Sequence, residues 1–272
     1  MKIIIPMAGE SERFRKAGYA IPKPLILVDG KPMIEHVIDL FPGEEDFVFV
    51  CNSNDLQNTN LRSVLLGKKP KAKIIEIEFG KFGPVWSVVE ALKKEDFLDD
   101  GPTIVNYCDF GAFWDYEAFK AKMKETNCDG CITAYKGFHP HSLGNTYYGY
   151  LKLDKDGYME EIKEKESYTS NRMEEYASAG TYYLRNGGMV RKYFAELLEK
   201  KINKNGEYYV SLVYNLMQRD GLRTHIYELE YFLQWGTPMD LQEYQFWSDY
   251  FSKDRLNGKA MNGQEGESTR KK

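Results

Sequence analysis

Short apolar runs alternate with amphipathic segments through the first half of the chain. In the amphipathic segments apolar residues recur at the spacing that places them on one face of a helix. Such alternation is typical of βαβ units, so we expect a mostly parallel sheet joined by right-handed crossovers. The predicted strands are residues 2–7, 46–51, 72–79, 103–108 and 130–136, and the predicted helices are residues 32–40, 55–66, 85–94 and 115–124.

The second half of the chain does not continue this alternation of predicted strands and helices. Residues 154–157 contain the Asp-Gly pair that is typical of tight turns, so the flanking segments 147–154 and 158–165 are expected to pair as a β-hairpin. The remaining predicted elements are a strand at 176–184, helices at 188–200 and 208–220, a strand at 224–229 and a helix from Thr237. From about Ser252 the chain is polar and charged without apolar periodicity, which indicates a disordered tail over residues 253–272. We therefore expect one α/β domain over residues 1–252, with a mixed, mostly parallel sheet flanked by helices.

Composition and charge narrow the class of protein. With 42% apolar and 14% aromatic residues among its 272, the chain is typical of a globular protein. The 37 Lys and Arg against 41 Asp and Glu give a net charge of −4, which offers no support for binding to nucleic acid or to a membrane surface. The first apolar run is too short for a signal peptide, and no segment has the length of a membrane span, so we expect a cytoplasmic location.

Cys128 and Cys131 form a CxxC pair, which is found in zinc sites and in redox motifs. A zinc site would need two more ligands at suitable spacing, and a redox pair normally lies at a strand-to-helix turn. We interpret the two cysteines as small apolar residues at the start of a strand.

The loop after the first predicted strand, residues 6–14, is rich in small residues and contains Arg13. Backbone N–H groups that converge in such a loop attract phosphate, because no side chain blocks its approach. The forked guanidinium of Arg13 could bind phosphate oxygens, and Lys23 would add a mobile point charge. The alternative is an ordinary strand-to-helix loop with two solvated cations.

This segment resembles the N-terminal signature of the nucleoside-triphosphate transferase family, the sugar-1-phosphate nucleotidyltransferases and the related cytidylyltransferases of capsule and surface polysaccharide biosynthesis. The matching residues are Ala8-Gly9, Arg13-Phe14, Pro22-Lys23-Pro24-Leu25 and Gly30-Lys31-Pro32-Met33-Ile34. The resemblance implies that the loop and Arg13 hold a triphosphate, and that Lys23 contacts the phosphate under attack. The chain departs from the pattern at Ser11, which replaces a second glycine between Glu10 and Glu12. Carboxylates near a triphosphate are unfavourable unless they point away or meet a cation.

A second motif places a carboxylate after the fourth predicted strand, in Asn106-Tyr107-Cys108-Asp109. An Asp at the carboxyl end of a central parallel strand faces the ligand crevice, where a hard cation that bridges phosphates needs oxygen ligands. The resemblance aligns Asp109 with the metal ligand of the family and implies Mg²⁺ as the cofactor. The alternative, an Asp that caps the following helix, fits Asp115 better.

The resemblance also assigns a site for a phosphorylated acceptor. The segments that carry it are Tyr148-Gly149-Tyr150, Glu164-Lys165, Ser178-Ala179-Gly180 and Gln234-Trp235-Gly236-Thr237-Pro238. A further segment, Gly206-Glu207-Tyr208-Tyr209, resembles a stretch that precedes a helix in the family. The acceptor-binding residues that the resemblance implies are Gly149, Glu164, Lys165, Gly180 and Gln234. Lys165 would neutralise the attacking phosphate, although the alternating charges of residues 163–166 also fit a solvated run. Gln234 stands where many members have a second metal-ligating Asp, so we expect weaker or differently arranged metal binding.

The base of the nucleotide is expected to lie against residues 81–87. Backbone groups near Gly83 and the Ser87 hydroxyl could bind a pyrimidine edge, and Asn52 and Ser53 could add to this site. The predicted nucleotide-binding residues are Met7, Ala8, Gly9, Glu10, Ser11, Arg13, Lys23, Asn52, Gly83, Pro84, Ser87 and Asp109. They leave CTP, UTP and dTTP open as the substrate.

The resemblance implies transfer of a nucleoside monophosphate to a phosphorylated acceptor, with release of pyrophosphate. Residues 1–136 would bind the nucleotide, residues 137–252 would bind the acceptor, and Arg13, Lys23 and Lys165 would be catalytic. A sugar 1-phosphate is the expected acceptor, and a non-sugar phosphate such as a phospho-amino acid or a phosphocholine-like molecule stays open, as does a homo-oligomer. A nucleotide-binding regulatory module is the non-enzymatic alternative. A nicotinamide dehydrogenase is disfavoured, because Gly-x-Gly-x-x-Gly is absent and Pro22 and Pro24 interrupt the expected first helix.

Overall fold

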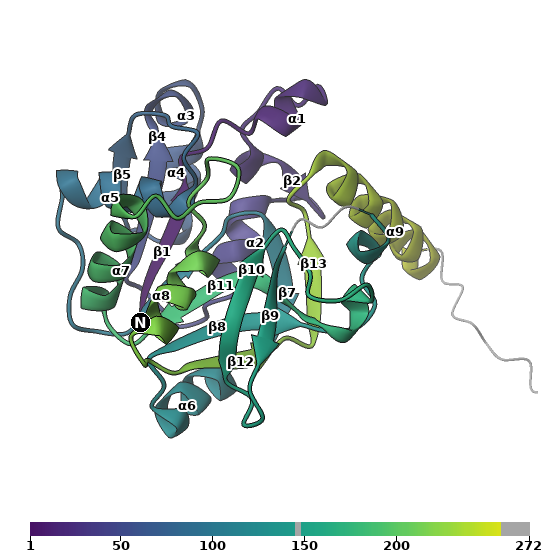
Figure 1. Ribbon diagram of the computed structural model, residues 1–272. Coiled ribbons are helices and arrows are strands. Elements are labelled where there is room, and N and C mark those ends of the chain that lie inside the picture. Colours follow the sequence, from purple (N-terminus) through teal and green to yellow (C-terminus); the bar gives the residue numbers. More distant parts are fainter. Residues whose placement is uncertain (145–147, 257–272) are drawn as a thin grey trace, which may run out of the picture.

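The computed structural model describes residues 1–144 and 148–256 (Figure 1). Its centre is a mixed sheet whose main path runs β10-β9-β11-β6-β1-β4-β5. The strands that the N-terminal half contributes to this path are mutually parallel: β1 (Lys2–Met7) lies between β4 (Phe47–Asn52) and β6 (Thr103–Asn106), and β4 also pairs with β5 (Lys73–Ile77). The two short strands β2 (Leu27–Val28) and β3 (Lys31–Pro32) form a separate antiparallel pair. The parallel sheet predicted for this half is confirmed.

The second half continues the sheet with antiparallel pairs around one long strand, β11 (Tyr176–Leu184). β11 pairs with β6, β8 (Gly130–Tyr135) and β9 (Gly149–Leu153). β9 and β10 (Met159–Glu164) form the predicted hairpin, and β12 (Thr224–Glu228) runs parallel to β8. The predicted mixed sheet flanked by helices is therefore confirmed, and the hairpin extends one edge of it.

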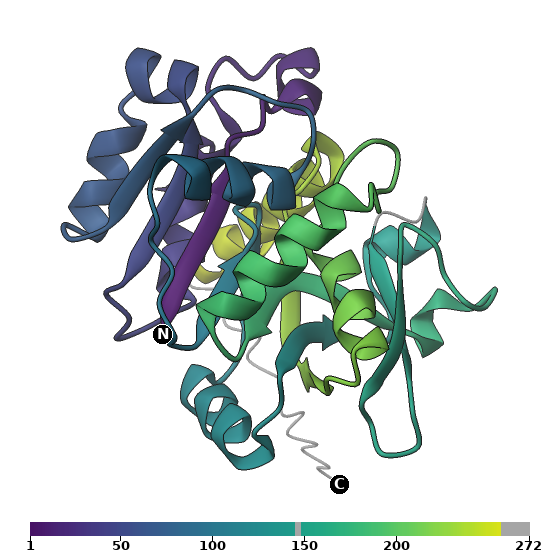
Figure 2. The ribbon, with the colours of Figure 1, turned by 60° about the vertical axis from the view of Figure 1, so that its left-hand side comes forward.

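Helices cover both faces of the sheet, so the side chains of β1 are buried on both sides. Ile3 and Ile5 pack on one face with α2 (Met33–Asp39), α4 (Leu61–Lys68) and α6 (Tyr116–Thr126). Ile4 faces the opposite core, which α5 (Pro84–Lys94), α7 (Gly187–Glu199) and α8 (Val213–Arg219) complete. In Figure 2 these last three helices lie on one side of β1. A strand that is buried on both faces needs apolar residues at every position.

Several predicted boundaries are corrected. The predicted helix 55–66 is two helices, α3 (Ser53–Asn58) and α4, because the chain is extended at Thr59. A second sheet of β7 (Phe110–Phe113) and β13 (Tyr231–Gln234) was not predicted. The helix predicted at 208–220 is the shorter α8, which follows a 3-10 turn over Val210–Leu212.

The last helix, α9 (Pro238–Leu256), enters the predicted tail, since its backbone stays helical through Leu256. The rest of that tail, residues 257–272, lies outside the described residues, and so does Tyr147 of the predicted hairpin.

Cys128 and Cys131 are buried at the start of β8, as their small apolar character predicted. Burial raises the pKa of both thiols, so neither is a ready thiolate. Within the part of the chain whose side chains the structure describes, no cluster of three His, Cys, Asp or Glu side chains could hold a metal ion. The helices of this same part of the chain are too short or too polar to cross a membrane.

The start of α7 depends on a glycine that touches the backbone of another segment. Gly187 donates its N–H to the Asp99 carbonyl at 3.1 Å, and an added Cβ would lie 2.4 Å from that oxygen. We expect Gly187→Ala to lower the free energy of unfolding by about 1–3 kcal/mol, the usual cost of overpacking. Chemical denaturation measures this change.

Gly67 in α4 is the matched control, because nothing lies within 4 Å of a Cβ added there. Gly67→Ala should raise the free energy of unfolding by about 0.5–1 kcal/mol, the gain in helix propensity. Equal effects of the two substitutions would show that contact with Asp99 does not limit the packing of α7.

Candidate active site

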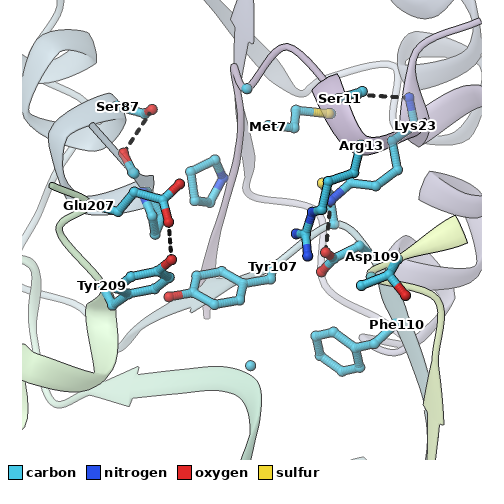
Figure 3. Close-up of a pocket in the computed structure, with 18 of the residues that line it drawn as sticks. Met7, Ser11, Arg13, Lys23, Ser87, Tyr107, Asp109, Phe110, Glu207 and Tyr209 are labelled. Atoms are coloured by element: carbon cyan, nitrogen blue, oxygen red, sulfur yellow. Dashed lines mark hydrogen bonds and ion pairs between the residues drawn. The ribbon is translucent and has the colours of Figure 1, made fainter. Parts of the chain in front are cut away.

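A cleft of about 780 Å³ opens where β1 and β6 end, and both halves of the chain line it (Figure 3). Ligands of open α/β sheets bind beyond the carboxyl ends of the strands. The residues predicted to bind nucleotide that line the cleft are Met7, Ala8, Gly9, Glu10, Ser11, Arg13, Lys23, Gly83, Pro84, Ser87 and Asp109. The residues predicted to bind acceptor that line it are Gly149, Glu164, Lys165, Gly180 and Gln234.

An ion pair joins the N-terminal segment to the end of β6. Lys23 Nζ lies 2.7 Å from Asp109 Oδ2, and both side chains are largely buried. The Lys23 N–H also donates to Ser11 Oγ at 3.1 Å, which ties the lysine to the loop after β1. Burial alone would lower the pKa of Lys23, but the charge of Asp109 and its hydrogen bond outweigh burial and raise it. Lys23 is therefore a cation at neutral pH, held beside a carboxylate.

The loop after β1 accommodates its two carboxylates by pairing them with cations. Glu10 lies 2.7 Å from Arg15, and Glu12 lies 2.8 Å from Lys16 and 2.9 Å from Lys81. The negative charge that Glu10 and Glu12 bring to the loop is thus offset.

Two further features suit this loop to phosphate. Ser11 has a φ of 56°, the left-handed region that glycine adopts most easily, which fits a position where the resemblance leads us to expect a glycine. Arg13, on the short helix α1 (Glu12–Lys16), points into the cleft, as Figure 3 shows.

The loop before α5 is hydrogen-bonded to a segment that is distant in the sequence, at Tyr208. Gly83 has a φ of 84°, and an added Cβ would lie 2.8 Å from the Tyr208 nitrogen. Tyr208 donates its N–H to the Phe82 carbonyl and accepts from the Val85 N–H. Ser87 Oγ donates to the Gly83 carbonyl at 3.2 Å, which leaves its lone pairs for a ligand.

Asn52 is the predicted nucleotide-binding residue that does not line the cleft. Its side chain accepts from the Asp55 N–H at 2.8 Å and donates to Asp55 Oδ2 at 2.7 Å, so it caps α3. Its amide also lies 3.5 Å from the Gly9 carbonyl. Asn52 therefore supports the loop from behind, and its contact with the base stays a prediction.

On the opposite wall, Glu164 at the end of β10 is buried and accepts a hydrogen bond from Ser211 at 2.5 Å. Gly149 of β9 faces it, and an added Cβ there would lie 3.1 Å from Glu164 Oε2. Burial raises the pKa of Glu164 to about 7, and the Ser211 hydrogen bond only partly offsets this rise. Near neutral pH the group can thus either donate or accept a hydrogen bond.

Lys165 follows Glu164 and lies beside Glu207 and Tyr209. Its Nζ is 3.4 Å from Glu207 Oε2 and 4.5 Å from the centre of the Tyr209 ring. It donates to the Tyr209 hydroxyl, which in turn donates to Glu207. Residues 137–252 thus contribute to the cleft a cation, Lys165, that has two partners on one side, and Lys204 of the same part of the chain also lines the cleft.

The pairing of β13 with β7 brings Gln234 opposite Phe110, next to Asp109. The Trp235 N–H donates to the Asp109 carbonyl at 3.2 Å, and a Cβ on Gly236 would lie 3.2 Å from Asp109 Oδ2. Gln234 is 6% exposed, and none of the described residues donates to its buried Oε1. A carboxylate and an unpaired amide oxygen are the hard ligands that Mg²⁺ accepts, so these residues fit the implied metal. The remaining ligands would be substrate oxygens and water.

Several polar residues that line the cleft were not predicted to bind a ligand, and four of them have side chains that could contact one. They are Tyr107, Glu207, Tyr209 and Asp240. Residues 206–209 were recognised as a motif without a role, and Tyr107 lies inside the Asp109 motif. Asp240 accepts from Thr237 Oγ1 and donates its N–H to the same oxygen, so a Thr-x-x-Asp capping pattern could have placed it beside the Gln234 segment.

Comparison with known proteins identifies a family whose model covers more than half of the chain. Residues 3–164 match the model described as the MobA-like NTP transferase domain. A search among curated protein sequences finds no significant match.

Solved structures extend the likeness to nearly the whole chain. A nucleoside-diphosphate-sugar pyrophosphorylase from Vibrio cholerae RC9 matches with a TM-score of 0.70 at 21% identity, over 90% of this chain and 99% of that one. A UDP-glucose pyrophosphorylase complexed with UDP-glucose matches with a TM-score of 0.70 at 16% identity, over 93% and 98%. The inositol-1-phosphate CTP transferase from T. maritima matches with a TM-score of 0.67 at 16% identity, over 91% and 94%. At these identities the likeness establishes the fold, which is of the expected nucleotide-diphospho-sugar transferase type.

The raised pKa of Glu164 predicts a pH dependence of stability. Between the ordinary value of 4.5 and about 7, folded Glu164 binds a proton that the unfolded chain has released. Its contribution to the free energy of unfolding therefore falls as the pH rises through this window, by up to about 3 kcal/mol.

Glu164→Gln removes the titration and keeps an acceptor for Ser211. We expect the wild type to lose stability relative to this variant between about pH 5 and 7, as measured by denaturation at each pH. Parallel curves for the two proteins would mean that Glu164 ionises as freely in the folded chain as in the unfolded one.

Proposed function

The chain belongs to the MobA-like NTP transferase domain family, and we propose that its cleft transfers a nucleoside monophosphate from a nucleoside triphosphate to a small phosphorylated acceptor. The observation that carries this proposal is the arrangement of charges. Lys23 and Asp109 are paired at 2.7 Å below the loop after β1, and Lys165 lies in the other half of the same cleft. Two phosphorylated substrates that must meet need a cation on each side.

The proposed reaction joins the acceptor phosphate to the α-phosphorus of the triphosphate. An acceptor phosphate oxygen attacks that phosphorus, and the bond to the oxygen that bridges the α- and β-phosphates breaks. Pyrophosphate leaves with the electron pair of that bond. No general base is needed, because the attacking phosphate is already ionised near neutral pH. The protein supplies position and charge, which is what phosphoryl transfer mainly requires.

Each proposed role follows from the position of a side chain in the cleft. Lys23 would stabilise charge on the α-phosphate, and Arg13, which points into the cleft, would hold the departing pyrophosphate. Lys165 would orient the attacking phosphate from the opposite wall. Asp109, with the amide oxygen of Gln234, would hold Mg²⁺, which neutralises phosphate charge when it is bound. Lys23 contacts Asp109 through Oδ2, so a metal held by the same carboxylate would compete with this contact and leave Lys23 available to the phosphate.

A sugar 1-phosphate is the acceptor that we favour. Two of the structural matches are pyrophosphorylases of nucleotide sugars, and a third transfers from CTP to inositol 1-phosphate. A second candidate, a non-sugar phosphate that carries a cation, is favoured by the aromatic wall of the cleft. Phe232 and Tyr148 lie edge to face at 5.8 Å, and the carboxylate of Asp240 lines the same cleft. Aromatic faces beside a carboxylate bind an ammonium group as well as a sugar ring.

One screen tests the proposed reaction. Purified protein is incubated with Mg²⁺, with CTP, UTP or dTTP, and with a panel of glucose 1-phosphate, inositol 1-phosphate, phosphocholine and phosphoserine, and pyrophosphate release is measured. We expect release that depends on one triphosphate, one acceptor and the metal. Tight binding of a triphosphate without pyrophosphate release for any acceptor would favour the regulatory module.

The positions of Asp109 and Gln234 in the cleft lead to a prediction about metal binding. Gln234→Asp would add a second carboxylate beside Asp109 and should lower the Mg²⁺ concentration for half-maximal activity or triphosphate binding by about tenfold, the effect of one added charged ligand. Asp109→Asn should abolish the Mg²⁺ dependence of triphosphate binding. Calorimetric titration of each variant with CTP, UTP or dTTP at several Mg²⁺ concentrations measures both effects.

The control is Asp156→Asn, because Asp156 lies on the β9–β10 turn and does not line the cleft. A Mg²⁺ titration of Gln234→Asp that superimposes on the wild-type curve would give residue 234 a structural role only.

A further inference from the structure

The backbone of Lys165 is fixed more firmly than an exposed charge run would require. Its φ is 56°, a left-handed conformation that is uncommon for a residue with a side chain. Its N–H donates to the Tyr148 carbonyl at 2.8 Å, which continues the pairing of β9 and β10 by one residue. The Cα position is thereby defined, but a lysine side chain has four rotatable bonds beyond it.

Glu207 and Tyr209 determine where that side chain ends. The three polar groups form a closed triangle: Lys165 Nζ donates to the Tyr209 hydroxyl, that hydroxyl donates to Glu207 Oε2, and Nζ lies 3.4 Å from the same oxygen. The ammonium also lies 4.5 Å from the centre of the Tyr209 ring. An ammonium has three protons, so two contacts on one side leave a donor for a ligand. Figure 3 shows Glu207 and Tyr209 together at the cleft wall.

The segment that carries these two residues is itself held by the nucleotide half. Glu207 and Tyr209 face the cleft, whereas Tyr208 between them bonds through its backbone to Phe82 and Val85. The Tyr208 N–H donates to the Phe82 carbonyl at 2.8 Å, and the Val85 N–H donates to the Tyr208 carbonyl at 3.1 Å. At the other end, the backbones of Lys204 and Glu207 exchange two hydrogen bonds and close a turn. Glu207 and Tyr209 are therefore held in place independently of Lys165.

We propose that Glu207 and Tyr209 are positioning residues that hold Lys165 Nζ in the orientation in which it meets the acceptor phosphate. The proposal rests on the proposed function of the cleft. Without these contacts the lysine would sample many rotamers, and ordering it would draw on the binding energy of the acceptor. A charge placed wrongly by about 1 Å can lower a rate by about a hundredfold.

Kinetics of two conservative variants test the proposal. Glu207→Gln keeps the shape and loses the charge, and Tyr209→Phe keeps the ring and loses the hydroxyl. With whichever of glucose 1-phosphate, inositol 1-phosphate and phosphocholine supports turnover, kcat/KM for the acceptor should fall by about ten- to a hundredfold. The dissociation constant of the triphosphate, measured by calorimetry, should stay within about twofold of the wild-type value, since only the acceptor side is changed.

Glu166→Gln is the matched control, because Glu166 follows Lys165 and pairs instead with Lys163 and Lys204. It does not line the cleft, and the variant should keep wild-type kinetics. Wild-type kcat/KM in both Glu207→Gln and Tyr209→Phe would overturn the proposal, and so would equal losses in the control.

A second measurement needs no turnover and so separates this proposal from the proposed reaction. Sulfo-N-hydroxysuccinimide acetate acylates lysines, and mass spectrometry of the peptide that contains Lys165 gives its rate. Each substitution should release the ammonium from one partner and so increase the rate of Lys165 acylation by about fivefold, in Glu207→Gln and in Tyr209→Phe. A fivefold change corresponds to an interaction of about 1 kcal/mol. Glu166→Gln should leave the rate unchanged. If the wild type transfers to no acceptor, faster acylation still supports the positioning of Lys165, and an unchanged rate in both variants overturns it.

Discussion

The ion pair between Lys23 and Asp109 is the interaction on which the cleft depends. It joins two residues that are 86 positions apart, one on the segment after α1 and the other at the end of β6. Two charges that have left water are stable only when each meets the other and further hydrogen-bond partners. Backbone hydrogen bonds hold the two residues in place, since the Lys23 N–H donates to Ser11 Oγ and the Trp235 N–H donates to the Asp109 carbonyl. The loop after β1, the end of β6 and the segment between β13 and α9 thus meet at one pair of charges.

Other charged side chains at the cleft also form pairs between a cation and a carboxylate. Lys165 lies beside Glu207, and the acidic loop is paired with Arg15, Lys16 and Lys81. These pairs keep a cavity rich in charge close to neutral before any ligand enters. Under the proposed function, a metal-bound triphosphate would bring a cation for Asp109 and anions for Lys23, so both partners of the central pair could be satisfied after they separate. The interaction that stabilises the cleft would then also be the one that substrate binding replaces.

The sequence predicted the parts of this site that depend on neighbouring residues. The apolar run of β1, the small residues after it and the carboxylate after β6 all lie in short segments, and the parallel sheet then brings their ends together. Contacts between distant segments could not be predicted in the same way. Glu207 and Tyr209 approach Lys165 because the Tyr208 backbone is hydrogen-bonded to the loop at Gly83. No sequence pattern indicates the hydrogen bonds between these two distant segments. The strands β7 and β13 are four residues each, too short to show a period. The cap that Asn52 forms on the Asp55 N–H was not predicted, because an Asn after a strand fits a ligand contact and a helix cap equally well.

A double-mutant cycle between Lys23→Met and Asp109→Asn tests the central pair most directly. The free energy of unfolding is measured for the wild type, both single variants and the double variant, in the absence of metal and nucleotide. The structure predicts a coupling energy of about 1–3 kcal/mol, because each single variant leaves a largely buried charge or amide without its partner. Single effects that add to within about 0.5 kcal/mol would contradict the dependence of the cleft on this ion pair.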